Sequence, residues 1–135
     1  MAAPIWADAQ ATADAEKLAL EIAGRNVGAE VMTAARRVAE AHIDILRVRQ
    51  VVTELISPGL TDEPFCPSTR IPSRKELELM QGPPCPQKLA YVLADSWNDL
   101  QKIERYERRA LSRRKFAIRD FDMAVAQDVL SAETA

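Results

Sequence analysis

Eight basic side chains crowd into residues 102–119, where only Glu104 and Glu107 oppose them. The segment therefore carries a local net charge of +6 within a chain whose formal net charge is −2. In a helical projection at about 100° per residue, seven of the eight bases lie in one arc. A helix with a basic face can lie along a phosphate backbone, because arginine offers planar pairs of donors to phosphate oxygens. The candidate phosphate contacts are Arg105, Arg108, Arg109, Arg113, Lys115 and Arg119.

Phe116 projects into the same basic arc, where an exposed aromatic ring could stack on a base. The same pattern also suits a solvated helix face or a face that contacts another protein. We favour a solvated or protein-contacting face over nucleic-acid binding, because no helix-turn-helix, zinc-finger or RNA-binding signature accompanies the arginines. Binding of nucleic acid is the alternative.

Glu107 and Arg114 interrupt the opposite, apolar face of the same helix. A charge on a packed face is costly unless it is paired. We therefore expect each of them to meet an opposite charge or a polar group on a facing helix, where such contacts fix the register. A polar ligand pocket is the alternative. The candidate partners are His42 or Arg37 for Glu107, and Glu30 or Glu21 for Arg114.

The residues that catalysis or metal binding would need are nearly absent. His42 is the only histidine, and with Cys66 and Cys85 it supplies fewer than the four ligands of a structural zinc site. Ser112 has no histidine within reach on its own helix, and no phosphate-binding loop is present. We expect no catalytic, cofactor or metal site. Free thiols are favoured over a disulfide that would close the loop between the two cysteines.

The elements that would position these residues are long helices. A heptad pattern runs through residues 29–57 and ends at Pro58-Gly59. A weaker, alanine-rich helix is predicted over residues 7–23, and residues 88–130 contain neither proline nor glycine. The heptad positions are Val31, Ala34, Val38, Ala41, Ile45, Val48, Val52 and Leu55. The apolar face of residues 88–130 comprises Leu89, Val92, Leu93, Leu100, Ile103, Ala110, Leu111, Ile118, Phe121 and Val125.

Residues 58–87 hold seven of the eight prolines and are predicted to form a linker. A short helix over residues 73–81, with Ser73 as its N-cap, could interrupt this linker.

We predict one all-α domain, residues 1–135, built as an elongated antiparallel hairpin or coiled-coil-like three-helix arrangement with a proline-rich loop. In the favoured geometry the first two helices lie end to end against the long third helix, with Leu18 or Ile22 beside Phe121. In the alternative, the first helix folds back into a short bundle and leaves the end of the long helix free or dimerised.

Two stretches resemble a widespread group of short bacterial proteins of unknown function. They are ARRVAEAHIDILRVRQ at residues 35–50 and KLAYVLADSWNDLQKIERYERRALSRRKFAIRDFD at residues 88–122. In that group a helix rich in "AEAQ-D--RVR" precedes a variable loop and "L--L-RYERRALSRRK-A-R". The resemblance implies a helical hairpin and supplies no catalytic residue, cofactor or substrate.

The start of the chain has no signal-peptide pattern, and no apolar run is long enough for a membrane span. We therefore expect a cytoplasmic protein without membrane contacts. The favoured function is a non-enzymatic interaction or scaffold protein that self-associates through its apolar heptad seam or binds a protein partner. The alternative is a nucleic-acid-binding accessory protein that uses residues 102–119.

Overall fold

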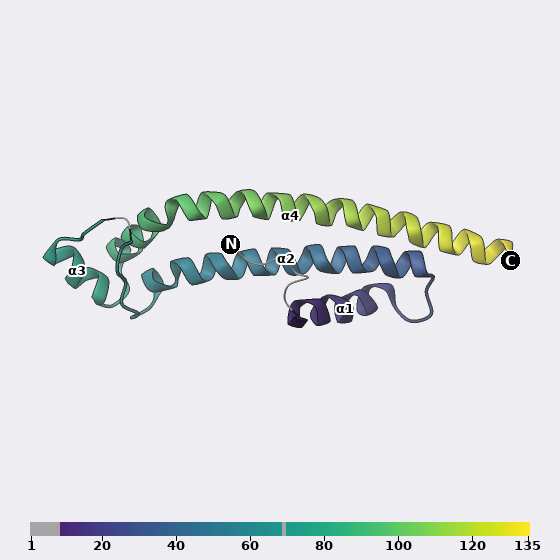
Figure 1. Ribbon diagram of the computed structural model, residues 1–135, viewed down its shortest axis with the longest axis horizontal. Coiled ribbons are helices and arrows are strands. Elements are labelled where there is room, and N and C mark those ends of the chain that lie inside the picture. Colours follow the sequence, from purple (N-terminus) through teal and green to yellow (C-terminus); the bar gives the residue numbers. More distant parts are fainter. Residues whose placement is uncertain (1–8, 69) are drawn as a thin grey trace. The chain divides into compact units, whose positions relative to one another are not determined.

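A computed structural model describes residues 9–68 and 70–135, and these residues form helices and connecting segments without any strand. The all-α prediction is therefore confirmed. The chain divides into two compact units, described separately below. The three-helix unit comprises residues 9–47 and 107–135, and the loop unit comprises residues 48–106. The helices are α1 (Ala9–Ala23), α2 (Ala29–Leu60), α3 (Arg74–Gln81) and α4 (Pro86–Thr134), as labelled in Figure 1.

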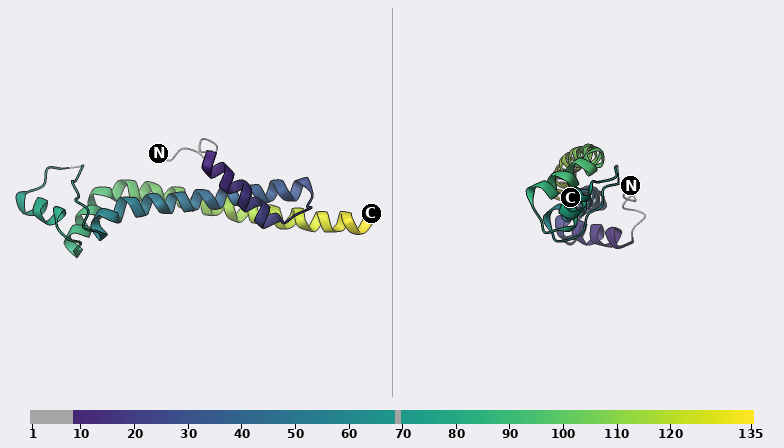
Figure 2. Two further views of the ribbon diagram at one scale, coloured as in Figure 1. Left: turned by 90° about the horizontal axis from the view of Figure 1, so that it is seen from below. Right: turned by 90° about the vertical axis from the view of Figure 1, so that its left-hand side faces the viewer.

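In the three-helix unit, α1 folds back against α2 and crosses it obliquely (Figure 2). The contact is a cluster of four buried alanines, whose small side chains allow the helix backbones to approach closely. An ion pair of 2.8 Å between Glu16 and Arg36 joins the two helices. Leu18 and Ile22 from α1 and Phe121 from α4 pack around the cluster. The four alanines are Ala15, Ala19, Ala35 and Ala39.

The predicted end-to-end arrangement of the first two helices is therefore wrong, and the folded-back alternative describes this unit. The reversal depends on the turn between α1 and α2, where Gly24 and Asn26 have φ angles of 80° and 62°. Glycine, and next to it asparagine, adopts this left-handed conformation most readily. Residues 7 and 8 of the predicted first helix lie outside the described residues.

The C-terminal part of α4 buries a narrower face than predicted. Ile118 and Val125 are exposed, whereas Ala110 and Ala117 are buried. Ala110 and Ala117 are seven residues apart, so the packed face follows a seven-residue repeat. A projection at about 100° per residue drifts by roughly 20° with each such repeat. Because of this drift, the projection placed Ile118 and Val125 on the apolar face, although both lie beside the packed face in the structure.

In the loop unit, α2 continues through Pro58 and Gly59 to Leu60, so the predicted helix end at residue 57 is three residues short. Gly59 is buried, and a Cβ atom there would lie 2.8 Å from Cδ1 and 3.0 Å from Cα of Leu89. Glycine at this position thus serves close helix packing. The missing N–H of Pro58 costs one hydrogen bond near the end of the helix, where the contact with Leu89 holds the last turn.

The starts of α3 and α4 show conventional capping. Ser73 and Glu76 form a capping box at the start of α3, as the N-cap prediction required. Helix α4 begins at Pro86 and ends at Thr134, beyond both predicted limits of residues 88 and 130. Proline is well suited to the first helical position, and Sγ of Cys85 accepts a hydrogen bond from the Lys88 N–H at 3.4 Å. Within the described residues, no helix has the length and apolar character that crossing a membrane requires.

Candidate functional site

Roughly 100° around α4 from its buried alanines, the three-helix unit exposes three large apolar residues. Phe116, Met123 and Leu130 have exposed fractions of 57%, 58% and 61%. Their spacing of seven places them on one side of the helix, and we call these three residues the outer line. Single exposed apolar residues are common on protein surfaces, but an ordered row of them points to an interaction surface. The sequence pattern indicates Phe116 only as a stacking candidate and singles out neither Met123 nor Leu130.

The predicted phosphate contacts of the three-helix unit are all exposed. One of them, Arg113, forms an ion pair with Asp44 of α2 at 3.3 Å. The guanidinium of Arg119 lies over the ring of Phe116, 5.8 Å from its centre. Arg105 is also exposed but belongs to the loop unit. The exposed residues are Arg108, Arg109, Arg113, Lys115 and Arg119.

The contact between Arg119 and Phe116 bears on the predicted base stacking. A cation over an aromatic ring is favourable and occupies one face of the ring. A nucleotide base could therefore stack on Phe116 only on the other face or by displacing Arg119. The pair is equally suited to packing against apolar side chains of another helix, because the arginine stem is itself apolar.

Arg114 meets a polar group on the facing helix, as predicted, but its partner is His42. Nη1 of Arg114 lies 3.2 Å from Nδ1 of His42. A guanidinium can only donate, so Nδ1 of the imidazole is the acceptor in this contact. Neither Glu30 nor Glu21 is needed to pair Arg114. Glu107, the third predicted register residue, is half-buried on α4.

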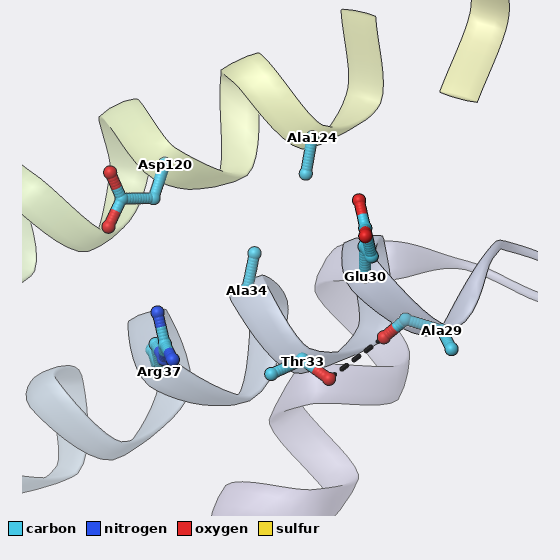
Figure 3. A pocket seen from close by; sticks show the side chains of 7 residues that line it. All are labelled: Ala29, Glu30, Thr33, Ala34, Arg37, Asp120 and Ala124. Atoms are coloured by element: carbon cyan, nitrogen blue, oxygen red, sulfur yellow. Dashed lines mark hydrogen bonds between the residues drawn. The ribbon is translucent and has the colours of Figure 1, made fainter. Parts of the chain in front are cut away.

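A hollow open to solvent lies between α2 and α4 in the three-helix unit (Figure 3). Ala34 and Ala124 point toward one another across it, and their small side chains leave the space unfilled. Arg37 and Asp120 add charges of opposite sign to its lining. The hydroxyl of Thr33 donates to the Ala29 carbonyl at 2.8 Å, so this hydroxyl is already engaged with its own helix. The hollow offers no activated nucleophile.

Among the described residues, no group of three histidine, cysteine or acidic side chains could hold a metal ion. Cys66 is exposed and Cys85 is half-buried, and both are free thiols in this structure.

The loop unit contains a buried charge that the sequence analysis missed. Lys88 is fully buried, and its ammonium group donates three hydrogen bonds to backbone carbonyls. The acceptors are the carbonyl oxygens of Thr61, Glu63 and Gly82, at 2.9, 2.7 and 2.9 Å. All three donors of the ammonium are therefore used. A lysine near a helix start ordinarily indicates a solvated side chain, so no sequence signal identified this contact.

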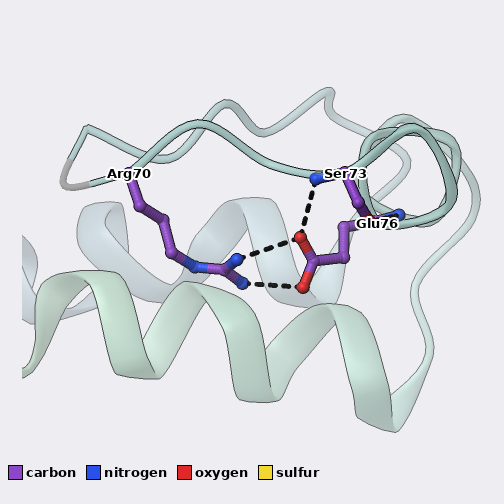
Figure 4. A network of polar contacts seen from close by, with 3 residues as sticks. All are labelled: Arg70, Ser73 and Glu76. Atoms are coloured by element: carbon purple, nitrogen blue, oxygen red, sulfur yellow. Dashed lines mark hydrogen bonds and ion pairs between the residues drawn. The ribbon is translucent and has the colours of Figure 1, made fainter.

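A second polar network holds the segment before α3. Arg70 donates two hydrogen bonds to the carboxylate of Glu76, at 2.9 and 3.0 Å, and the Ser73 N–H donates to the same group at 2.9 Å (Figure 4). These donors, Arg70 first, lower the pKa of Glu76 to about 2. The backbone N–H of Ser68 also donates to Asp95 of α4 at 3.1 Å. Charged side chains thus organise this segment.

Comparisons with known proteins give no match: no family model, curated protein or solved structure is significantly similar to this chain. A function must therefore be inferred from the surfaces themselves. The outer line is a regularly spaced row of exposed apolar residues that lies outside the buried core of its unit.

Proposed function

We propose that this protein is a non-enzymatic helical interaction protein that self-associates through α4. The outer line carries this proposal, because Phe116, Met123 and Leu130 remain more than half exposed. Burying a large apolar side chain completely is worth about 1.5–3 kcal/mol. Covering three of them at once would stabilise an assembly appreciably.

The surface that mediates assembly in this proposal differs from the one the sequence indicated. The heptad seam of α2 was the expected interface, but its members in the three-helix unit are buried within the chain. A buried seam is not available to a second molecule without unfolding. The outer line of α4 takes over this role. The buried seam residues are Val31, Ala34, Val38, Ala41 and Ile45.

The proposal also includes an antiparallel hairpin of α2 and α4 and a cytoplasmic location. The pairing of Asp44 with Arg113 in the three-helix unit and the contact of Gly59 with Leu89 in the loop unit support the hairpin. Within the three-helix unit, Ala34 lies opposite Ala124 and the later Asp44 pairs with the earlier Arg113, as an antiparallel pair requires.

Light scattering coupled to gel filtration tests the proposal. We expect a mass of twice the 15.0 kDa chain, unchanged by the addition of a DNA duplex at about 150 mM salt. Dissociation should follow dilution, as mass action requires. A monomer at every protein concentration would contradict self-association.

Nucleic-acid binding is the second candidate, and the exposure of Arg109, Lys115 and Arg119 favours it. A phosphate-binding surface loses affinity steeply as salt rises, because bound counterions are released. The double substitution of Arg108 and Arg109 by glutamate should then abolish retention of DNA or RNA at about 50 mM salt. No retention of either polymer by the wild-type protein at that salt would exclude this candidate.

A further inference from the structure

The sign of charge changes abruptly along α4, and the outer line crosses this boundary. Residues 108–119 contain six bases and no acid, whereas residues 120–135 contain four acids and no base. Phe116 lies in the basic segment, and Met123 and Leu130 lie in the acidic segment. Any molecule that covers the whole line must therefore suit a positive surface at one end and a negative surface at the other.

We propose that the occupant is a second copy of this chain, bound to the outer line by an antiparallel α4 with the two-fold axis near Asp120. This inference rests on the proposed self-association and adds the partner, orientation and register. In such a dimer the basic segment of each copy lies along the acidic segment of the other. A two-fold axis forms every such contact twice, because the same patch is used by both molecules.

Residues at the edge of the outer line support the same orientation. Lys115 and Asp122 are both exposed, lie seven residues apart and so occupy the same position of the repeat. In antiparallel helix pairs, flanking positions of the same kind face each other, and their charges set orientation. With the axis near Asp120, Lys115 of each copy faces the partner's Asp122.

A parallel dimer would bring the same residues together with unfavourable charge. In register, the basic segment 108–119 of one copy would lie along the basic segment of the other, and the acidic segment 120–135 along the acidic segment. Like charges at a contact cost free energy and select against that orientation. In the proposed register Phe116 of each copy meets the partner's Met123, whereas in a parallel dimer each residue of the outer line meets its own equivalent; the charges favour the antiparallel orientation.

Cross-linking distinguishes the two orientations. Ser112→Cys and Ala126→Cys are prepared separately in a background with Cys66→Ser and Cys85→Ser, since both new positions are exposed on α4. The two sites lie two heptads apart, on the same side of the helix as the outer line. About the proposed axis, residue 112 of one copy lies close to residue 126 of the other. Identical sites would be separated by on the order of 20 Å, at ~1.5 Å per residue.

A short bis-maleimide is added to each variant alone and to an equimolar mixture, after light scattering has shown each variant to be dimeric. We expect cross-linked dimer mainly in the mixture, with mass spectrometry identifying one chain of each variant. Efficient cross-linking of each variant alone would show a parallel dimer and overturn this inference while leaving self-association intact. A wild-type monomer that gains mass only with a DNA duplex would contradict both.

Discussion

The two units of this protein are stabilised in different ways. In the three-helix unit, four alanines form a core with little bulk, and the large residues Phe116, Met123 and Leu130 stay outside it. In the loop unit, the long side chain of Lys88 is turned inward, and its charge is satisfied by three backbone carbonyls. The first unit joins α1 to α2 through close contact between small groups, beside the buried Val31 and Ile45 of α2. The second buries Met80 and Val92 and adds a charged group that reaches the backbone.

This difference explains why the three-helix unit is the better candidate for assembly. Alanine contacts bring helices together but bury little apolar area for each residue. The larger apolar side chains of α4 then remain available to another molecule. The following substitutions test the comparison in order of decreasing expected effect.

Lys88→Met should give the largest loss of stability. It removes three hydrogen bonds from a fully buried ammonium group and leaves the carbonyls of Thr61, Glu63 and Gly82 without this donor. We expect the free energy of unfolding to fall by about 2–4 kcal/mol, measured by urea unfolding. Lys75→Met, at an exposed position on α3, is the matched control and should change it by less than about 0.5 kcal/mol. Equal effects of the two variants would contradict the proposed role of Lys88.

Ala39→Leu tests the contact between α1 and α2. Ala39 is fully buried in the alanine cluster, so a larger side chain must push the helices apart. Overpacking of this kind costs about 1–3 kcal/mol. Ala13→Leu, at an exposed position on α1, provides the control. If thermal unfolding shows the two variants to be equally stable, α1 does not pack on α2 as described.

The contact between Arg114 and His42 should contribute less. Arg114→Met and His42→Phe should each lower stability by about 1 kcal/mol, because each removes one half-buried hydrogen bond. The double variant should lose less than the sum of the single losses, as a shared contact requires. Arg105→Met, an exposed position on the same helix, is the control. Unchanged melting and unchanged assembly of Arg114→Met would show that this pairing is unimportant.

The smallest effect concerns pH and the loop unit. The pKa of Glu76 is about 2 in the folded chain, below its ordinary value of 4.5. The unfolded chain therefore binds this proton more readily, so the contact with Arg70 stabilises the fold above pH 4.5 and ceases to do so as the pH falls toward 2. Carbon NMR of the carboxyl group should show a midpoint near 2, and Arg70→Gln should raise it. A wild-type midpoint near 4.5 would exclude this contact in solution.

The helices themselves could be predicted, because periodicity and capping act locally. The heptad of α2, the absence of proline and glycine from residues 88–130 and the N-cap Ser73 each indicated the correct element. Helix ends were less accurate where packing decides them. Gly59 was interpreted as a helix stop, whereas it lies inside the helix because Leu89 approaches its backbone.

The contacts between helices could not be predicted from the sequence and were seen only in the structure. A lysine that folds inward cannot be distinguished in sequence from one that points to solvent, so Lys88 was missed. The fold-back of α1 depends on the turn around Gly24 and on alanine faces that fit end-to-end packing equally well. Only the outer line carried an overlooked signal, since Phe116, Met123 and Leu130 repeat every seven residues.

The central claim is that the outer line is the self-association surface of this protein. The most direct test compares the light-scattering masses of Met123→Glu and Leu20→Glu at one concentration. Leu20 is a suitable control, because it is 56% exposed in the same unit but lies on α1. We predict a monomer for Met123→Glu and an unchanged dimer for Leu20→Glu. A dimer that persists in Met123→Glu would contradict the claim.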